Sequence, residues 1–186
     1  MLSPPQLSVV AQVILGVLGA VAAAFDIRFR RIPNWLVLAG IIAGFGSNFI
    51  TAGWHGFSYA AAGLGLGLAL YFPLYLLRAR GAGDVKLLAA AGSIAGPGNC
   101  LWIFVLTALF GGLIAVIWLL LRGRARQTFF NVGWIVRDLM QFKAPYHSSE
   151  ELDVTTARGM RLPHAAMIAV GILAFFVVLH YRIGFR

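Results

Sequence analysis

Residues 81–95 read Gly-Ala-Gly-Asp-Val-Lys-Leu-Leu-Ala-Ala-Ala-Gly-Ser-Ile-Ala, an acid flanked by glycines at the start of an apolar run. Acids are rare in this chain, and four of the six lie between residues 138 and 153 in one polar segment. Only Asp26 and Asp84 border long hydrophobic stretches. An ionisable side chain at the edge of a membrane segment is energetically costly, so each marks a candidate functional site.

The composition around this stretch is that of an integral membrane protein. Of the 186 residues, 60% are hydrophobic and 11% are charged, whereas soluble domains carry about 25% charged residues. A single cysteine, Cys100, excludes an internal disulfide and a cysteine-pair metal site. The N-terminus lacks the basic start of a secretory signal peptide, so we expect the first apolar run to be kept as a membrane span.

Apolar runs separated by turn residues predict an all-α, polytopic membrane protein with six transmembrane helices, in which residues 1–186 form one domain. A helix needs about 20 apolar residues to cross about 30 Å of hydrocarbon. Turn residues at 31–34, 81–83 and 96–99 mark breaks. The predicted spans are about 7–25, 35–50, 57–77, 84–95, 101–121 and 165–181, of which the fourth is short.

Lysine and arginine residues set the expected orientation of these spans. Thirteen of the 15 lie in three connecting segments, 26–34, 78–86 and 122–162. Basic residues are retained on the cytoplasmic side, so these segments are predicted to be cytoplasmic and both termini to lie outside. Because topology accounts for most of the net charge of +9, no nucleic-acid partner is expected.

Two further patterns concern packing and the long connecting segment. Small residues at 63, 65 and 67 and at 89–93 predict that the third and fourth spans are internal, as in ordinary tight helix packing. In segment 122–162, apolar residues recur at near-helical spacing. This pattern fits an amphipathic helix on the cytoplasmic face, and it fits a partly ordered tether equally well.

The predicted topology places Asp26 and Asp84 at the same membrane depth. Asp84 has a structural interpretation as a helix N-cap after glycine. Asp26 lies at the C-terminus of the first span, where the helix dipole disfavours an anion, and its structural alternative is a salt bridge to a neighbouring arginine. Lys86, a cation in a first helical turn, would be explained by a nearby anion or by lipid phosphate.

The functional interpretation of the two acids is an aspartyl dyad. Two close carboxylates share one proton, so one can activate water while the other assists at a carbonyl oxygen. This chemistry needs no metal and no cofactor, which suits a chain with one cysteine and four scattered histidines. No serine or cysteine nucleophile with a partner base emerges at that face.

Two motifs in the sequence resemble those of the type IV prepilin peptidases, which are membrane-embedded aspartyl proteases of the GxGD type. Residues 81–86 match the GxGD motif and the lysine that follows it. Residues 26–34, Asp-Ile-Arg-Phe-Arg-Arg-Ile-Pro-Asn, resemble the first-aspartate motif of that family. The Leu-Pro pair at 162–163, before the last span, also fits, and the resemblance covers most of the chain.

The resemblance implies that Asp26 and Asp84 are the catalytic pair, with Gly81, Gly83 and Lys86 supporting the site. It implies an aspartic-type endopeptidase that cuts the short basic leader from prepilins or pseudopilins at the cytoplasmic face of the bacterial inner membrane. The expected partners are the substrate helix and the lipid bilayer. The particular pilin, the substrate-binding residues and the oligomeric state stay open.

Larger relatives carry an N-terminal cytoplasmic region with paired cysteines that is linked to N-methylation. Here the first span begins near residue 7 and there is one cysteine. The resemblance is therefore to the short, peptidase-only branch associated with tight-adherence (Flp-type) pili, and no methyltransferase activity is expected. Gly81 and Gly83 are predicted to give the backbone freedom to shift when substrate enters.

Two other functions compete with a peptidase. A small proton-coupled transporter would use the acids as a relay, although relay acids usually lie nearer the membrane midplane on broken helices. A non-catalytic membrane scaffold for pilus assembly would tolerate alanine at both aspartates.

Overall fold

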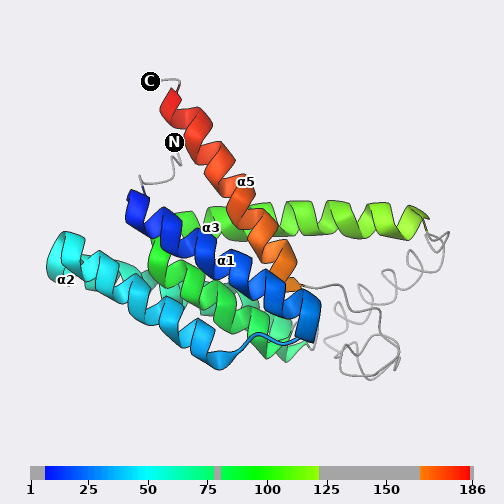
Figure 1. Ribbon diagram of the computed structural model, residues 1–186, viewed down its shortest axis with the longest axis horizontal. Coiled ribbons are helices and arrows are strands. Elements are labelled where there is room, and N and C mark those ends of the chain that lie inside the picture. Colours follow the sequence, from blue (N-terminus) through cyan, green and yellow to red (C-terminus); the bar gives the residue numbers. More distant parts are fainter. Residues whose placement is uncertain (1–6, 78–80, 122–163, 185–186) are drawn as a thin grey trace, which may run out of the picture.

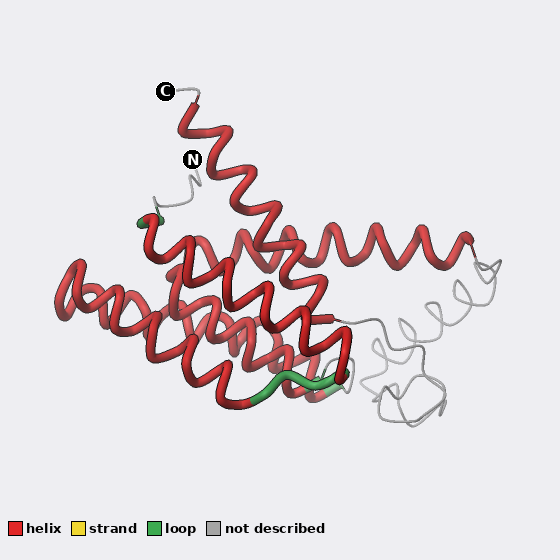
Figure 2. The backbone as a smooth tube through the Cα atoms, in the orientation of Figure 1, coloured by secondary structure: helices red, strands yellow, loops and turns green. Residues whose placement is uncertain are grey.

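The computed structural model describes residues 7–77, 81–121 and 164–184, and over these residues the chain is helical apart from short connections (Figures 1 and 2). The helices are α1 (Val9–Phe29), α2 (Asn34–Leu76), α3 (Ala82–Leu121) and α5 (His164–Gly184). All four are long and apolar enough to cross a membrane. The described part of the chain thus contains four candidate spans where the sequence predicted six, because α2 and α3 are each continuous across an internal break. The predicted features of segment 122–162 lie outside the described residues.

Helix α1 extends further than the sequence predicted. It begins after Ser8, whose Oγ accepts the N–H of Ala11 at 3.2 Å, as an N-cap serine does. It continues beyond the predicted end at Phe25 to Phe29, and Arg30 closes it in the left-handed region at φ 52°. The N–H of Arg30 donates to the carbonyl of Asp26. Asp26 therefore lies in the last turn of α1, at the helix C-terminus where the sequence placed it.

Helix α2 is broken at Ala52 and Gly53, and its two arms fold back on each other. Gly53 has φ 57° and ψ −134°, a conformation that glycine adopts readily. Phe45 and Phe57 lie on opposite sides of the break with ring centroids 4.8 Å apart, whereas twelve residues of unbroken helix would separate them by about 18 Å. The first arm (34–51) and second arm (54–76) thus form a helical hairpin, which turns at the α2 label in Figure 1.

Helix α3 is broken at Gly96, inside the turn predicted at 96–99. Gly96 has φ 77° and packs on the ring of Tyr59. Pro97 lacks an N–H, so the helix cannot supply the usual donor to the carbonyl of Ser93. Asn48 supplies one instead: its Nδ2 donates to Ser93 O at 3.1 Å and to Ile94 O at 3.2 Å. A side chain of α2 thereby compensates the break in α3.

The first arm of α3 (82–95) lies between the two arms of α2, and its residues 87–95 are all buried. Gly63 and Gly92 bring the backbones of the two helices into direct contact, and Gly67 packs on the backbone at Leu88. A methyl group at Gly65 would meet nothing within 4 Å. The prediction of an internal fourth span is confirmed, and the packing role predicted for the third span belongs to Gly63 and Gly67 but not to Gly65.

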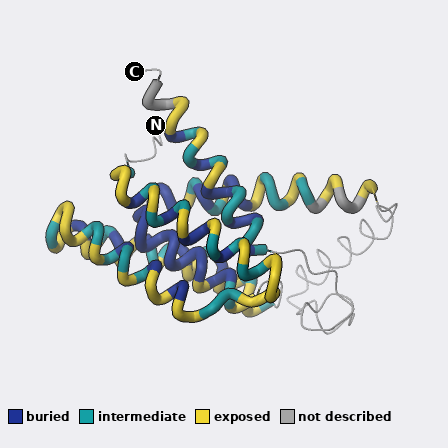
Figure 3. The backbone as a smooth tube through the Cα atoms, viewed as in Figure 1, coloured by how far each residue is buried: buried dark blue, intermediate teal, exposed yellow. Residues whose placement is uncertain are grey.

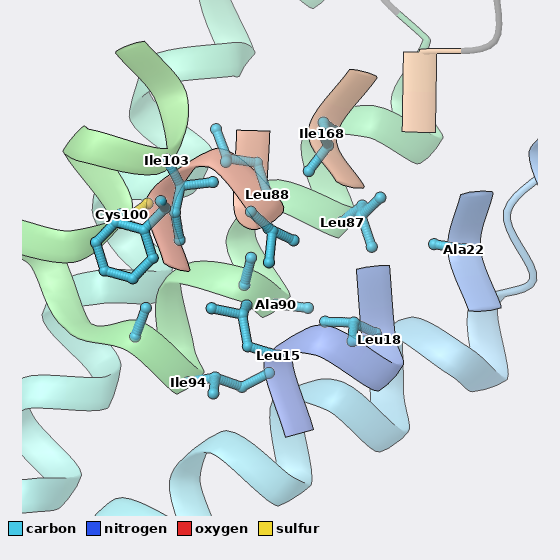
Figure 4. Close-up of a cluster of buried hydrophobic side chains, with 14 of the residues drawn as sticks. Leu15, Leu18, Ala22, Leu87, Leu88, Ala90, Ile94, Cys100, Ile103 and Ile168 are labelled. Atoms are coloured by element: carbon cyan, nitrogen blue, oxygen red, sulfur yellow. The ribbon is translucent and has the colours of Figure 1, made fainter. Parts of the chain in front are cut away.

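Helices α1 and α5 pack against each other and close the other side of α3. Gly19 of α1 lies against Ile172 and Ala169 of α5, and Gly16 lies against Phe176. Buried positions gather where these elements meet α3 (Figure 3). Figure 4 shows this core, to which α1, α3 and α5 contribute Leu15, Leu18, Leu87, Leu88, Ile94, Ile103 and Ile168. Since Leu87 and Leu88 follow Asp84 by one turn, the core forms an apolar wall behind that acid.

Candidate active site

Asp84 lies in the first turn of α3 and is buried, with 7% of its surface exposed. The helix begins at Ala82, so Asp84 is inside it and not at the N-cap position that was its structural alternative. Its backbone N–H donates to the carbonyl of Gly81 at 3.1 Å. The helix dipole favours an acid in a first turn, but burying a carboxylate against an apolar core is costly. A single cap does not account for this placement.

Asp26 is held from a distant part of the chain. Its Oδ2 accepts the backbone N–H of Ala165 at 2.8 Å, across 139 residues of sequence. Ala165 lies in the first turn of α5, where backbone N–H groups have no partner within the helix and the dipole is positive. An acid at the unfavourable end of α1 is thus matched to the favourable end of α5, a partner that the sequence did not indicate.

Two side-chain contacts join the motif at 26–34 to the motif at 81–86. Lys86 Nζ donates to Oδ1 of Asn34 at 3.2 Å. A methyl group at Gly83 would lie 3.3 Å from Cδ1 of Ile32, so glycine lets this turn of α3 approach the α1–α2 connection. The two motifs therefore pack side by side, although 52 residues separate Asn34 from Lys86. The partner of Lys86 in this contact is a neutral amide, where the sequence suggested an anion.

Neither Gly81 nor Gly83 has a positive φ, and of the two only Gly83 makes a close approach to a neighbour. Gly83 faces Ile32, whereas a methyl group at Gly81 would lie 3.8 Å from Oδ2 of Asp84. The space beside the Asp84 carboxylate is thus bordered by a residue without a side chain. Whether either glycine lets the loop move on substrate entry stays a prediction.

The last turn of α1, with Asp26, contacts the first turn of α5 through the Ala165 amide (Figure 1). The first turn of α3, with Asp84, contacts residues 32–34, which follow α1. The arrangement offers two carboxyl groups, one buried and one held by a backbone amide, at the rim of an apolar core. Such groups can perform general acid–base chemistry. Among the described residues, no group of three or more His, Cys, Asp or Glu side chains could hold a metal ion.

Sequence reasoning missed two members of the site. The Ala165 amide is a backbone group, and the alanine side chain has no functional chemistry. No residue pattern could therefore point to it. The only hint is Pro163, which precedes the helix and has no side-chain oxygen to cap it. Asn34 ends the first motif, but nothing in that motif indicated Lys86 as its partner.

Comparison with known proteins agrees with this arrangement. The family described as the type IV leader peptidase family matches residues 13–116, which is more than half of the chain and includes both aspartates and both motifs. Helix α5 lies outside the matched residues. No curated protein and no solved structure matches the chain significantly. The paired motifs, the membrane-length helices and this match together show that the chain belongs to the type IV leader peptidase family.

Proposed function

We propose that this protein is an aspartic endopeptidase of the bacterial inner membrane that removes the leader from prepilins or pseudopilins, with Asp26 and Asp84 as its catalytic pair. Family membership supports peptidase activity. The observation that carries the assignment of residues is the packing of the two motifs through Lys86–Asn34 and Gly83–Ile32. These contacts pack the first turn of α3, which bears Asp84, against residues 32–34, which follow the end of α1 that bears Asp26.

In the proposed reaction the pair shares one proton. The ionised carboxylate takes a proton from a water molecule, whose oxygen bonds to the carbonyl carbon of the scissile peptide. The protonated carboxyl group hydrogen-bonds the carbonyl oxygen as negative charge develops there. When the intermediate collapses, the C–N bond breaks and the leaving amine takes a proton from the pair. The reaction consumes one water and regenerates both carboxyl groups.

The proposed topology has six crossings, in which each arm of α2 and of α3 spans the membrane separately. The first arm of α2, with 18 residues between Asn34 and the break at Ala52, is about 27 Å long at 1.5 Å per residue. That length suits a hydrocarbon core of about 30 Å. With basic segments cytoplasmic, both termini lie outside and the acids lie at the cytoplasmic face.

This placement suits a substrate whose short basic leader stays in the cytoplasm and whose hydrophobic helix enters the membrane. The scissile bond between these two parts would lie at the depth of the helix ends that carry the acids. We expect the Flp-type pilins to be the substrate class. The proposal covers peptide cleavage alone and includes no N-methyl transfer.

The proposal is tested by co-expressing the protein with a prepilin in a host without its own prepilin peptidase. Asp26→Asn and Asp84→Asn should each reduce leader removal by about 1,000-fold or more, while both variants still accumulate in the membrane. Glu151→Gln, an acid outside both motifs, serves as the control and should cleave normally. Normal processing by either aspartate variant would show that the assignment is wrong.

A further inference from the structure

The first turn of α5 takes a hydrogen-bond acceptor from another helix. The residue before it, Pro163, has no side-chain acceptor, and helices normally satisfy a first-turn N–H with an oxygen from the N-cap residue. Here the oxygen comes from Asp26 on α1, whose Oδ2 lies 2.8 Å from the N atom of Ala165. A residue that the proposed mechanism uses is therefore also the cap of another helix.

We propose that the first turn of α5 is a positioning element of the active site, in which the Ala165 N–H holds Oδ2 of Asp26 and leaves Oδ1 to act on water. This inference rests on the proposed function and adds a backbone group from outside the family-matched residues 13–116. A carboxylate can accept at both oxygens, so one oxygen can be fixed while the other reacts.

The surroundings of the contact make it a rigid one. Ala165 is fully buried, and Ile168, one turn later, is 1% exposed. Further along the same interface, a methyl group added at Gly19 of α1 would lie only 3.0 Å from Cδ1 of Ile172. Close packing between α1 and α5 therefore fixes the amide relative to Asp26. A hydrogen bond to a charged acceptor is stronger than one between neutral groups.

The electrostatics point the same way. The C-terminal end of α1 carries a partial negative charge, which disfavours an ionised Asp26. The N-terminal end of α5 carries a partial positive charge and faces the carboxylate. Without the α5 amide, Asp26 would lose its orientation and one of the groups that stabilise its charged form, the other being Arg30. The expected consequence is a slower chemical step with little change in substrate binding.

The sharpest test replaces the amide alone. Lactic acid incorporated at position 165 of the full-length protein substitutes an ester for the amide and removes the N–H while keeping the methyl group. We expect kcat for prepilin cleavage to fall about 10-fold to 100-fold, with KM and the thermal midpoint nearly unchanged. The same ester at position 166 is the matched control, because it removes a neighbouring first-turn N–H, and its kcat should stay within about threefold of the wild type.

A second pair of variants uses ordinary residues. Ala165→Pro and Ala166→Pro each remove one N–H, and proline is tolerated in a first helical turn. The kcat of Ala165→Pro should fall, and that of Ala166→Pro should stay near the wild-type value. If the proline ring at the buried position 165 prevents folding, the comparison of the two esters tests the inference. Equal kcat for the two esters would overturn the inference. That result leaves the proposed function intact, provided that the wild type cleaves prepilin and Asp26→Asn does not.

Discussion

At the scale of single residues, Asp26 and Lys86 each contact a group from a distant part of the chain. Asp26 and Asp84 stand out because acids beside apolar runs are rare and costly. Their partners do not stand out, since Asp26 is held by a backbone amide and Lys86 by the side chain of Asn34. A backbone amide such as that of Ala165 leaves no signal in the sequence. The contact between Asn34 and Lys86 joins residues 52 positions apart. The sequence therefore singled out the two candidate acids, whereas the groups that contact Asp26 and Lys86 required the fold.

The contact between Gly83 and Ile32 gives a prediction at this scale. Gly83→Val should reduce prepilin cleavage at least about 10-fold, because a side chain there pushes Ile32 away and separates the two motifs. Adding Ile32→Ala should restore part of the activity by making room. Gly65→Ala is the control, since its methyl group would meet nothing within 4 Å. An unrescued double variant, assayed for leader removal, would rule out this contact as the cause.

At the scale of helices, the breaks were partly predictable and their compensation was not. Gly-Pro-Gly-Asn at 96–99 indicates a break because proline removes a helical donor, and the structure has one at Gly96. The reversal at Ala52 and Gly53 was predicted only as a gap between apolar runs. Helix α1 ends later than predicted because Ile27 and Phe29 continue the apolar pattern and Arg28 suits the negative end of the dipole.

Asn48→Leu tests how the break in α3 is stabilised. The substitution removes the donor shared by the carbonyls of Ser93 and Ile94, and each buried carbonyl left without a partner costs about 1–3 kcal/mol. We expect the unfolding free energy in detergent micelles to fall by about 2 kcal/mol or more. Ser47→Ala, which loses only a bond to Gly44 within its own helix, should change it by less than half as much. Equal losses would contradict the compensation.

The crossing of α2 and α3 at Gly63 and Gly92 gives a matched pair of variants. Gly63→Ala places a methyl group against the carbonyl of Gly92, so the helices must separate at a cost of about 1–3 kcal/mol. Gly65→Ala meets nothing within 4 Å and should be neutral or stabilising by up to about 1 kcal/mol, since alanine suits a helix interior better than glycine. Thermal unfolding of the two proteins distinguishes them, and indistinguishable midpoints would contradict the crossing.

At the scale of the whole molecule, the sequence predicted an all-helical membrane protein with internal third and fourth spans. The described residues are helical and the fourth span is internal. The third span is not, since only its Ala60, Gly63, Gly67 and Tyr71 are buried. The packing of α1 against α5 was not predictable, because glycines and alanines that allow close approach carry little information about which helix they meet. This packing brings the far end of the chain to Asp26.

The proposed six-crossing topology predicts where reagents can reach. In a Cys100→Ser background, a cysteine introduced at Ala52 should react with a membrane-impermeant maleimide added to intact spheroplasts, because the α2 reversal would face outward. A cysteine introduced at Arg31 should react only after the membrane is permeabilised. The opposite labelling pattern would show that the topology is inverted. If neither cysteine reacts before permeabilisation, the first arm of α2 does not cross the membrane.

The central claim is that Asp26 and Asp84 act together on one peptide bond, and the most direct test is an experimental structure with a non-cleavable prepilin helix bound. The account predicts that both carboxyl groups lie within about 3–4 Å of the scissile carbonyl or of its attacking water, with Oδ2 of Asp26 still bonded to the Ala165 amide. A scissile bond in contact with only one of the acids, or bound at another helix end, would contradict it.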